Sequence, residues 1–78
     1  MERTGTTIIR YKDTDEDGIW YIDIIDKNSI WEAWLSHDSY GISEMMFGSY
    51  APSLDEFCYL VESNLPDYKR GYKEQYFD

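Results

Sequence analysis

The chain has one cysteine and two prolines, and it lacks any apolar run of the ~20 residues that a membrane-spanning helix needs. A lone Cys58 cannot form an internal disulfide, so the usual staple of small secreted domains is missing and a reducing compartment is expected. The first residues, MERTGTT, also lack the apolar core of a signal peptide. These absences predict a cytoplasmic protein that does not enter a membrane.

Basic residues are scarce as well. Seven Lys and Arg stand against 16 Asp and Glu, which gives a formal net charge of -9, and positions 28 to 68 contain no Lys or Arg. A field of this sign repels phosphate backbones and anionic membrane surfaces. We therefore expect no direct binding of nucleic acid and no binding to membranes.

Aromatic residues are plentiful. They make up 18% of the chain, within a hydrophobic fraction of 42%. Buried aromatic side chains remove large areas from water, which helps to offset the entropy lost on folding. At 78 residues the chain has room for one core, so we expect a single folded domain over 1–78.

The N-terminal third has the pattern of a β-hairpin. Two runs of β-branched and aromatic residues, 6–12 and 19–25, flank the acidic segment DTDEDG. In the second run Trp20 and Ile22 share one face, and Asp23 lies on the other, which we expect to be the wetter side. A second turn at DKNS follows.

Residues 30–36 allow two interpretations. As a strand, the segment places Trp31 and Trp34 on opposite faces; as a helix capped by Ser29 and Glu32, it turns both tryptophans inward. The strand is favoured because the segment is short and the turn HDSYG leads to another strand-like run, 42–47. In that case Trp31 packs beneath a helix and Trp34 stays on the open side of the sheet.

The C-terminal part is helical. Ser53 and Glu56 form a capping box before apolar residues at three- and four-residue spacing. The helix is expected to end near Asn64, and Pro66 suits the first turn of a second one. The predicted fold class is α+β: an antiparallel sheet of three to four strands (about 6–12, 19–25, 30–36, 42–47) with one or two helices (about 54–64, 66–76) on one face.

The hairpin segment is the sharpest local motif. Residues 13–18 match the opening D-x-D-x-D-G of an EF-hand calcium loop, but Ile24 stands where the loop needs a bidentate glutamate. The alternative without metal is an acidic hairpin tip with a tight turn at Asp17-Gly18. A divalent-cation site is kept as an alternative function, with the ligands Asp13, Asp15, Asp17 and Asp23.

Catalytic patterns are missing. His37 and Cys58 are the only residues of their kinds, and Cys58 falls on the apolar face of the predicted helix, where a thiol is more often packing than nucleophile. No glycine-rich phosphate loop is present. We expect no enzyme activity, no catalytic residue and no cofactor.

The feature with functional content is the block of acidic residues without cations. Acidic, aromatic-rich surfaces suit docking on a basic groove, because complementary potentials steer encounter and aromatic residues act as anchors. We expect a protein partner with a basic surface, as in a nucleic-acid-binding protein. The alternatives are that the acids only confer solubility and that the chain is a housekeeping accessory protein or a homodimer. The candidate partner-binding residues are Asp13, Asp15, Glu16, Asp17, Glu32, Trp34, Asp38, Tyr40, Glu44, Asp55, Glu56 and Glu62.

A resemblance rests on the middle of the chain. The run 31–35 (WEAWL), followed by Asp38, 40–42 (YGI) and 46–48 (MFG), is similar to small uncharacterised acidic proteins of low-GC Gram-positive bacteria and their phages or mobile elements. By size and acidity the chain also resembles the anti-CRISPR class of phage inhibitors, some of which mimic DNA. The first resemblance implies no activity, and the second implies an inhibitor of a host nuclease without identifying any site residue.

Overall fold

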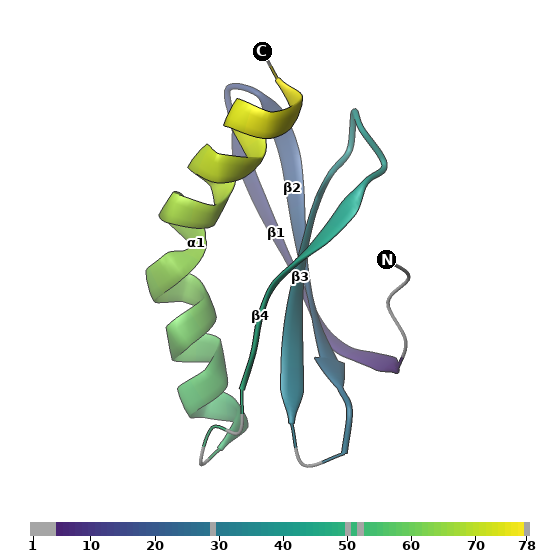
Figure 1. The fold of residues 1–78 in the computed structure, drawn as a ribbon, viewed down its shortest axis with the longest axis vertical. Helices are drawn as coiled ribbons and strands as arrows, with labels where there is room; N and C mark the ends of the chain where they lie inside the picture. Colours follow the sequence, from purple (N-terminus) through teal and green to yellow (C-terminus); the bar gives the residue numbers. More distant parts are fainter. Residues whose placement is uncertain (1–4, 29, 50, 52, 78) are drawn as a thin grey trace.

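Four antiparallel strands are followed by one long helix. The computed structural model describes residues 5–28, 30–49, 51 and 53–77. The sheet is a meander in the order β1-β2-β3-β4, and α1 lies along one of its faces (Figure 1). The predicted α+β class is confirmed. The elements are β1 (Thr6–Asp15), β2 (Gly18–Asp26), β3 (Trp31–His37), β4 (Ser43–Ser49) and α1 (Leu54–Tyr76).

The first hairpin is tighter than the sequence predicts. Strands β1 and β2 continue until Asp15 pairs with Gly18, so the turn consists of Glu16 and Asp17 and not of Asp17 and Gly18 as predicted. Gly18 has φ 133, a conformation that glycine adopts without a steric penalty. The amide of Asp17 donates to Asp15 Oδ1 over 2.9 Å, which stabilises the reversal.

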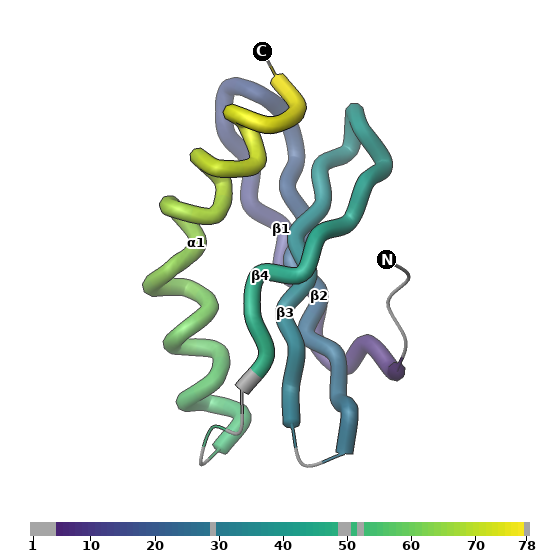
Figure 2. Tube along the Cα trace, viewed as in Figure 1, coloured from purple at the N-terminus to yellow at the C-terminus, as the bar shows by residue number. Residues whose placement is uncertain are grey.

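Residues 31–37 form a strand, as favoured, and Ser29, the cap of the helical alternative, lies outside the described residues. The strand pairs with β2 on one side and β4 on the other. Trp31 packs against Phe57 of α1 with 5.9 Å between ring centroids, so the placement of Trp31 beneath the helix is confirmed. The tube in Figure 2 shows β3 and β4 crossing as the sheet twists.

The core lies between the sheet and α1. Trp20, Ile22 and Ile24 of β2 face the helix, and Phe57 and Val61 face them from α1; all are at most 1% exposed. Alternation along the strand and three- and four-residue spacing along the helix supply the two apolar surfaces. Among the described residues no helix has the length and apolarity needed to cross a membrane.

Of the one or two helices predicted, one forms. The predicted helix end near Asn64 is wrong, because α1 is continuous through Pro66. Proline removes one backbone hydrogen bond, at a cost of about 3 kcal/mol in a helix interior. Packing beyond it opposes a break: Tyr72 is 2% exposed, and its ring lies 5.3 Å from that of Trp20. Before the proline, Asn64 Nδ2 donates to the Leu60 carbonyl over 2.8 Å. The helix curves around the sheet instead of ending (Figure 1).

The face opposite α1 is not the wet surface that the alternation suggested. Asp23 is 3% exposed and Ile25 is 0% exposed. Arg10 covers Asp23 through two hydrogen bonds, Nε to Oδ1 at 2.6 Å and Nη2 to Oδ2 at 2.8 Å. Gly5 lies so close to Ile25 that a Cβ on it would stand 2.6 Å from Ile25 Cγ2. The start of the described chain therefore covers part of this face.

Trp34 lies on this face, as predicted, but the prediction that it is exposed is wrong. Only 3% of the residue is accessible, because β3 is an inner strand and Trp34 stands between Asp23 of β2 and Met45 of β4. Its Nε1 donates to Glu32 Oε1 over 3.1 Å. Trp34 is therefore a packing residue and not a protruding anchor.

Candidate protein-binding surface

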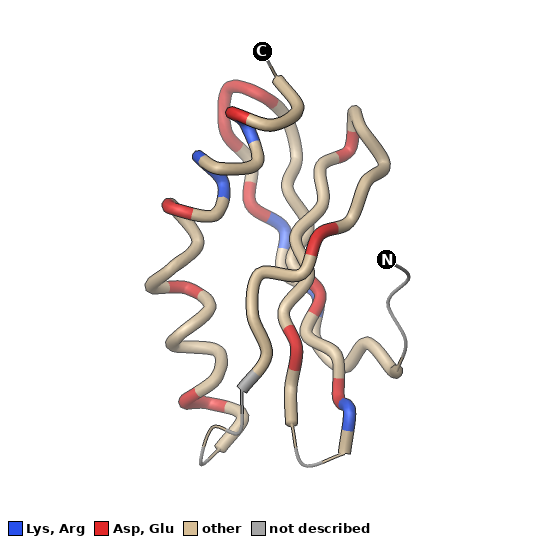
Figure 3. The backbone as a smooth tube through the Cα atoms, in the orientation of Figure 1, with Lys and Arg blue, Asp and Glu red and all other residues tan. Residues whose placement is uncertain are grey.

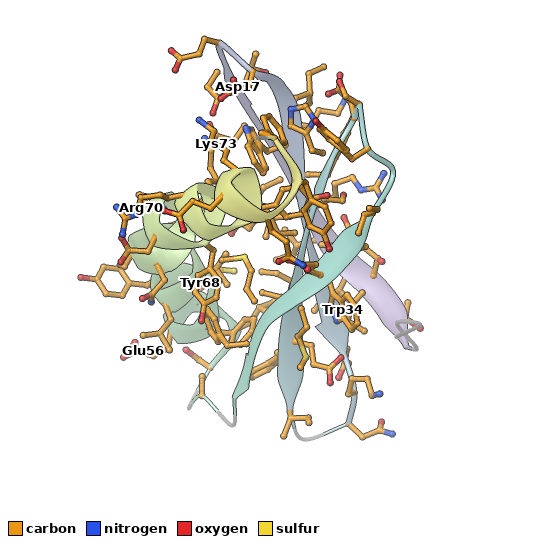
Figure 4. All side chains as sticks on the ribbon, turned by 45° about the horizontal axis from the view of Figure 1, so that its top comes forward. Asp17, Trp34, Glu56, Tyr68, Arg70 and Lys73 are labelled. Carbon is orange, nitrogen blue, oxygen red and sulfur yellow. The ribbon has the colours of Figure 1, made fainter. Side chains whose placement is uncertain are left out.

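The acidic residues of the β1–β2 hairpin are held by two lysines of α1. Lys69 Nζ lies 2.7 Å from Asp13 Oδ2 and 2.9 Å from Asp15 Oδ2. Lys73 pairs with Asp17 and lies 3.7 Å from Asp15 Oδ2. Figure 4 shows Lys73 pointing toward Asp17. Three of the four acidic tip residues therefore form ion pairs within the molecule.

Trp20 lies beneath this cluster. Its ring centroid is 5.4 Å from Lys69 Nζ and 6.0 Å from Lys73 Nζ, and its Nε1 donates to Asp15 Oδ2 over 2.9 Å. Burial opposes the ionisation of Asp15, but hydrogen bonds from Lys69, the Asp17 amide and Trp20 outweigh it and hold the pKa of Asp15 well below its ordinary value. The hairpin tip is thus a structural clamp that fixes the C-terminal half of α1.

The geometry does not favour the divalent-cation alternative. Asp13, Asp15 and Asp17 are bound to lysines, while Asp23 bonds to Arg10 on the face opposite α1. Among the described residues, no three His, Cys, Asp or Glu side chains come together as metal ligands. The four proposed ligands therefore do not converge.

Several predicted partner-binding residues of β3 and β4 have internal contacts. Glu32 accepts the hydrogen bond from Trp34, and Glu44 Oε1 accepts one of 2.7 Å from the Tyr76 hydroxyl. The bond to Glu44 raises the pKa of Tyr76.

The loop between β3 and β4 brings further candidates near the end of α1. Asp38 lies 3.3 Å from His37 Nδ1 and accepts a 3.3 Å hydrogen bond from the Ile19 amide. Tyr40, at 42% exposed, is accessible as predicted, although its ring also packs 4.9 Å from Phe77. The candidate residues therefore lie on different sides of the molecule and do not form one surface.

The outer face of α1 presents the acids that lack such partners. Asp55, Glu56 and Glu62 are exposed, and within the described part of the chain none of them forms an ion pair with Lys or Arg. In Figure 3 the first part of α1 carries only acidic segments, and basic ones begin toward its C-terminal end. We call Asp55, Glu56, Tyr59 and Glu62 the acidic helix face.

Tyr59 is the residue of this face that the sequence reasoning missed. It is 68% exposed, more than any other large hydrophobic residue among those described. Helical periodicity could have located it, because at 100° per residue Tyr59 points away from the side that holds Phe57 and Val61. An exposed tyrosine surrounded by carboxylates combines an apolar ring with a polar hydroxyl, which is typical of interface anchors.

The chemistry of the remaining polar groups is not that of a catalytic pair. His37 is 1% exposed, with its ring 4.8 Å from Trp20 and 4.9 Å from Phe77. Cys58 is half-buried, and its hydrogen bond with Tyr11, followed by burial, raises the pKa of that tyrosine. The two residues pack against different partners at different parts of the core.

Comparison with known proteins adds no family: no family model matches the chain, and no curated protein or solved structure matches it significantly.

Proposed function

We propose that this is a non-enzymatic interaction protein whose acidic helix face docks on a basic, nucleic-acid-binding surface of a larger protein and so inhibits or modulates it. The observation that carries the proposal is that Asp55, Glu56 and Glu62 surround the exposed Tyr59 and form no ion pair with Lys or Arg within the described part of the chain. The acids of the hairpin tip, in contrast, are used within the fold.

Electrostatics supports a basic partner. The net charge of -9 steers cationic surfaces toward the molecule, and a helix displays its carboxylates on a rigid scaffold, which avoids the ordering cost of a flexible acidic tail. Proteins that bind nucleic acid present Lys and Arg in grooves of the required sign. A nuclease of a host defence system is the case that we propose to test first, in line with the resemblance to phage inhibitors.

The anchor supports a specific contact instead of a diffuse attraction. Charged rims mainly raise association rates, whereas a buried aromatic side chain at the centre of an interface carries much of the binding free energy. Tyr59 stands at such a centre, one helical turn from Asp55 and close to one turn from Glu62. We therefore assign steering to the carboxylates and affinity to Tyr59.

Affinity capture with matched charge variants tests the proposal. The chain is immobilised as wild type, as Asp55→Asn/Glu62→Gln, or as the control Asp26→Asn/Glu74→Gln, which removes the same charge from exposed sites elsewhere. We expect wild type and control to retain a nucleic-acid-binding protein that excess duplex DNA or added salt releases, and the first variant to lose it. Retention that is insensitive to salt, DNA and the helix variant would overturn the proposal.

Tyr59→Ala separates anchoring from charge. It leaves the net charge unchanged, so the association rate should stay close to that of the wild type while dissociation becomes faster. Surface plasmon resonance with the captured partner measures both rates. An unchanged dissociation rate would remove Tyr59 from the interface.

A further inference from the structure

The outer edge of β4 is an unpaired strand edge. Strand β4 pairs with β3 on one side, and no other strand of the described chain pairs with it. Natural edges are often protected by lysine or proline, but β4 contains neither, and the residues Met45, Met46 and Phe47 make it apolar. The register shift opposite Ala33 and Trp34 leaves Met46 as an extra residue in the middle of β4, so the regular parts of the edge lie on either side of it. Backbone donors and acceptors are therefore available for another strand.

A hollow lies on each side of this edge. On the helix side, a cavity of about 280 Å³ is lined by Phe47, Gly48, Leu60, Asn64 and Tyr68. On the opposite face, a cavity of about 380 Å³ is lined by Trp34, Ser43, Glu44 and Met45. Figure 4 shows Tyr68 and Trp34 on the two sides of β4. A strand added at this edge would direct successive side chains alternately toward the two hollows.

The two hollows differ in chemistry. The helix-side hollow has the apolar side chains of Phe47 and Leu60 together with the ring of Tyr68, so it suits an apolar side chain. On the opposite face Glu32 bonds to the indole of Trp34, which places a carboxylate beside an aromatic ring. Because Trp34 is buried and Met45 in the same hollow is exposed, the site suits Lys or Arg, whose stem packs on Met45 while the cation meets the carboxylate.

The charge around the edge has one sign. No Lys or Arg occurs from position 28 to position 68, which covers β3, β4 and the first two-thirds of α1. Helical spacing puts Glu56 four residues before Leu60 and Asp67 three residues after Asn64, so carboxylates flank the helix-side hollow. The complementary occupant is cationic.

We infer that β4 accepts an extended segment of the partner as a fifth antiparallel or parallel strand, with apolar side chains entering the helix-side hollow and Lys or Arg lying over Met45 and Glu32. The inference deepens the proposed function, since it rests on a basic partner and names the form in which part of that partner binds. A second copy of the chain is the less suitable occupant, because pairing β4 with itself would join two molecules of charge -9.

The probe is the peptide acetyl-Lys-Val-Lys-Val-Lys-Val-amide, which alternates basic and apolar side chains. Amide hydrogen exchange followed by NMR should show new protection at β4 residues when the peptide is added. Two N-methylated forms, one blocked at the valine amides and one at the lysine amides, distinguish strand pairing from charge attraction. We expect one form to bind like the parent peptide. The other should bind at least about tenfold more weakly, because only one edge of the peptide faces β4.

A substitution at Gly48 tests the same site from the protein side. A Cβ on Gly48 would meet Glu32 Cγ and the Trp31 carbonyl at 3.5 Å, which is ordinary contact, so Gly48→Val should fold while placing its side chain beside Glu32, on the face opposite α1 where Lys or Arg would lie. We expect it to weaken peptide binding by about fivefold or more. The control Gly71→Ala, where a Cβ meets nothing within 4 Å, should bind like the wild type. Gly48→Ala, with a smaller side chain, checks that any loss follows the volume added and not misfolding.

Each outcome decides the question. Protection of β4 with unequal N-methylated peptides and weak binding by Gly48→Val supports strand addition. Absence of β4 protection, or equal effects of both N-methylations, overturns it; if Asp55→Asn/Glu62→Gln still abolishes partner capture, the proposed function stands without it. A stable dimer in sedimentation, with β4 protected in the absence of peptide, would show that a second copy of the chain occupies the edge of β4. This result would also overturn the inference.

Discussion

The two halves of α1 use their charges in opposite ways. In the C-terminal half, Lys69 and Lys73 are bound to aspartates of the hairpin tip above Trp20. In the N-terminal half, Asp55 and Glu62 face solvent beside Tyr59 with no described cation as partner. Both halves pack on the sheet, through Phe57 and Val61 in the first and Tyr72 in the second, but only the C-terminal half has its charges paired within the fold. A count of acidic residues cannot make this distinction, because the distinction depends on which carboxylates form ion pairs within the fold.

The strongest test of the contrast compares Trp20→Ala with Tyr59→Ala. Trp20 is 0% exposed and contacts His37, Tyr72 and Phe77, so its removal should cost about 3–5 kcal/mol of unfolding free energy. Tyr59 is 68% exposed, and its removal should change stability by less than about 0.5 kcal/mol. Urea denaturation followed by circular dichroism measures both. Similar midpoints for the two variants would contradict the contrast between the packed cluster around Trp20 and the exposed acidic helix face.

Gly18→Ala tests the packing of the β1–β2 hairpin tip by changing its backbone. Gly18 has φ 133, and a Cβ there would lie 2.8 Å from Asp38 Oδ1 and 2.9 Å from His37 Nε2. We expect a loss of about 1–3 kcal/mol, from backbone strain together with the displacement of these side chains. Gly71→Ala is the control, because its helical site is open, and it should stabilise the protein by up to about 1 kcal/mol. Thermal unfolding of both variants gives the comparison, and equal midpoints would argue against a tightly packed tip.

Acid should weaken the clamp before it affects the rest of the fold. The pKa of Asp15 is lowered in the folded state, so its contribution is present above the ordinary aspartate pKa of about 3.9 and is lost as the pH falls from there toward the lower folded value. The unfolding free energy of the wild type should therefore decrease below about pH 4. In Asp15→Asn this part of the decrease should be missing.

Denaturant titrations from pH 6 to pH 2 follow this difference. The gap between wild type and Asp15→Asn should be largest near neutral pH and should narrow as the acid is increased. A gap that stays constant over this range would mean that the ionised form of Asp15 contributes nothing to stability. The opposite trend, with a gap that widens in acid, would contradict the direction of the pKa shift.

Much of the fold follows from local patterns in the sequence. Alternation places Trp20 and Ile22 on the core face of β2, and the hydroxyl of Ser53 accepts the Glu56 amide at the start of α1 as the capping box predicts. The break at Pro66 could not be judged in this way, because the local penalty of a proline is opposed by the packing of Tyr72 on Trp20. Local rules describe the cost but not the distant contacts that outweigh it.

The candidate protein-binding surface was harder to predict from the sequence than the fold. Asp13 and Lys69 are 56 residues apart, so nothing local indicates that the hairpin acids are neutralised. Trp34 appears exposed from alternation alone, which does not show that its neighbours on both sides bury it. Tyr59, in contrast, could have been found from helical spacing. Charge pairing and burial depend on tertiary contacts, whereas the direction of a helical side chain depends only on its position.

The smallest expected change in stability comes from neutralising the acidic residues in the first turn of α1. Asp55 and Glu56 lie in the first turn of α1, where carboxylates interact favourably with the helix dipole by about 0.3–1 kcal/mol each at low ionic strength. Neutralising both also lowers the net charge from -9 to -7, which relieves repulsion within an acidic molecule. Because these two contributions have opposite signs, the stability of Asp55→Asn/Glu56→Gln should stay within about 0.5 kcal/mol of the wild type. Added salt should shrink any difference further, since it screens both interactions. A loss of several kcal/mol that persists at high salt would show that these acids hold the fold together, and the two halves of α1 would then no longer differ in role.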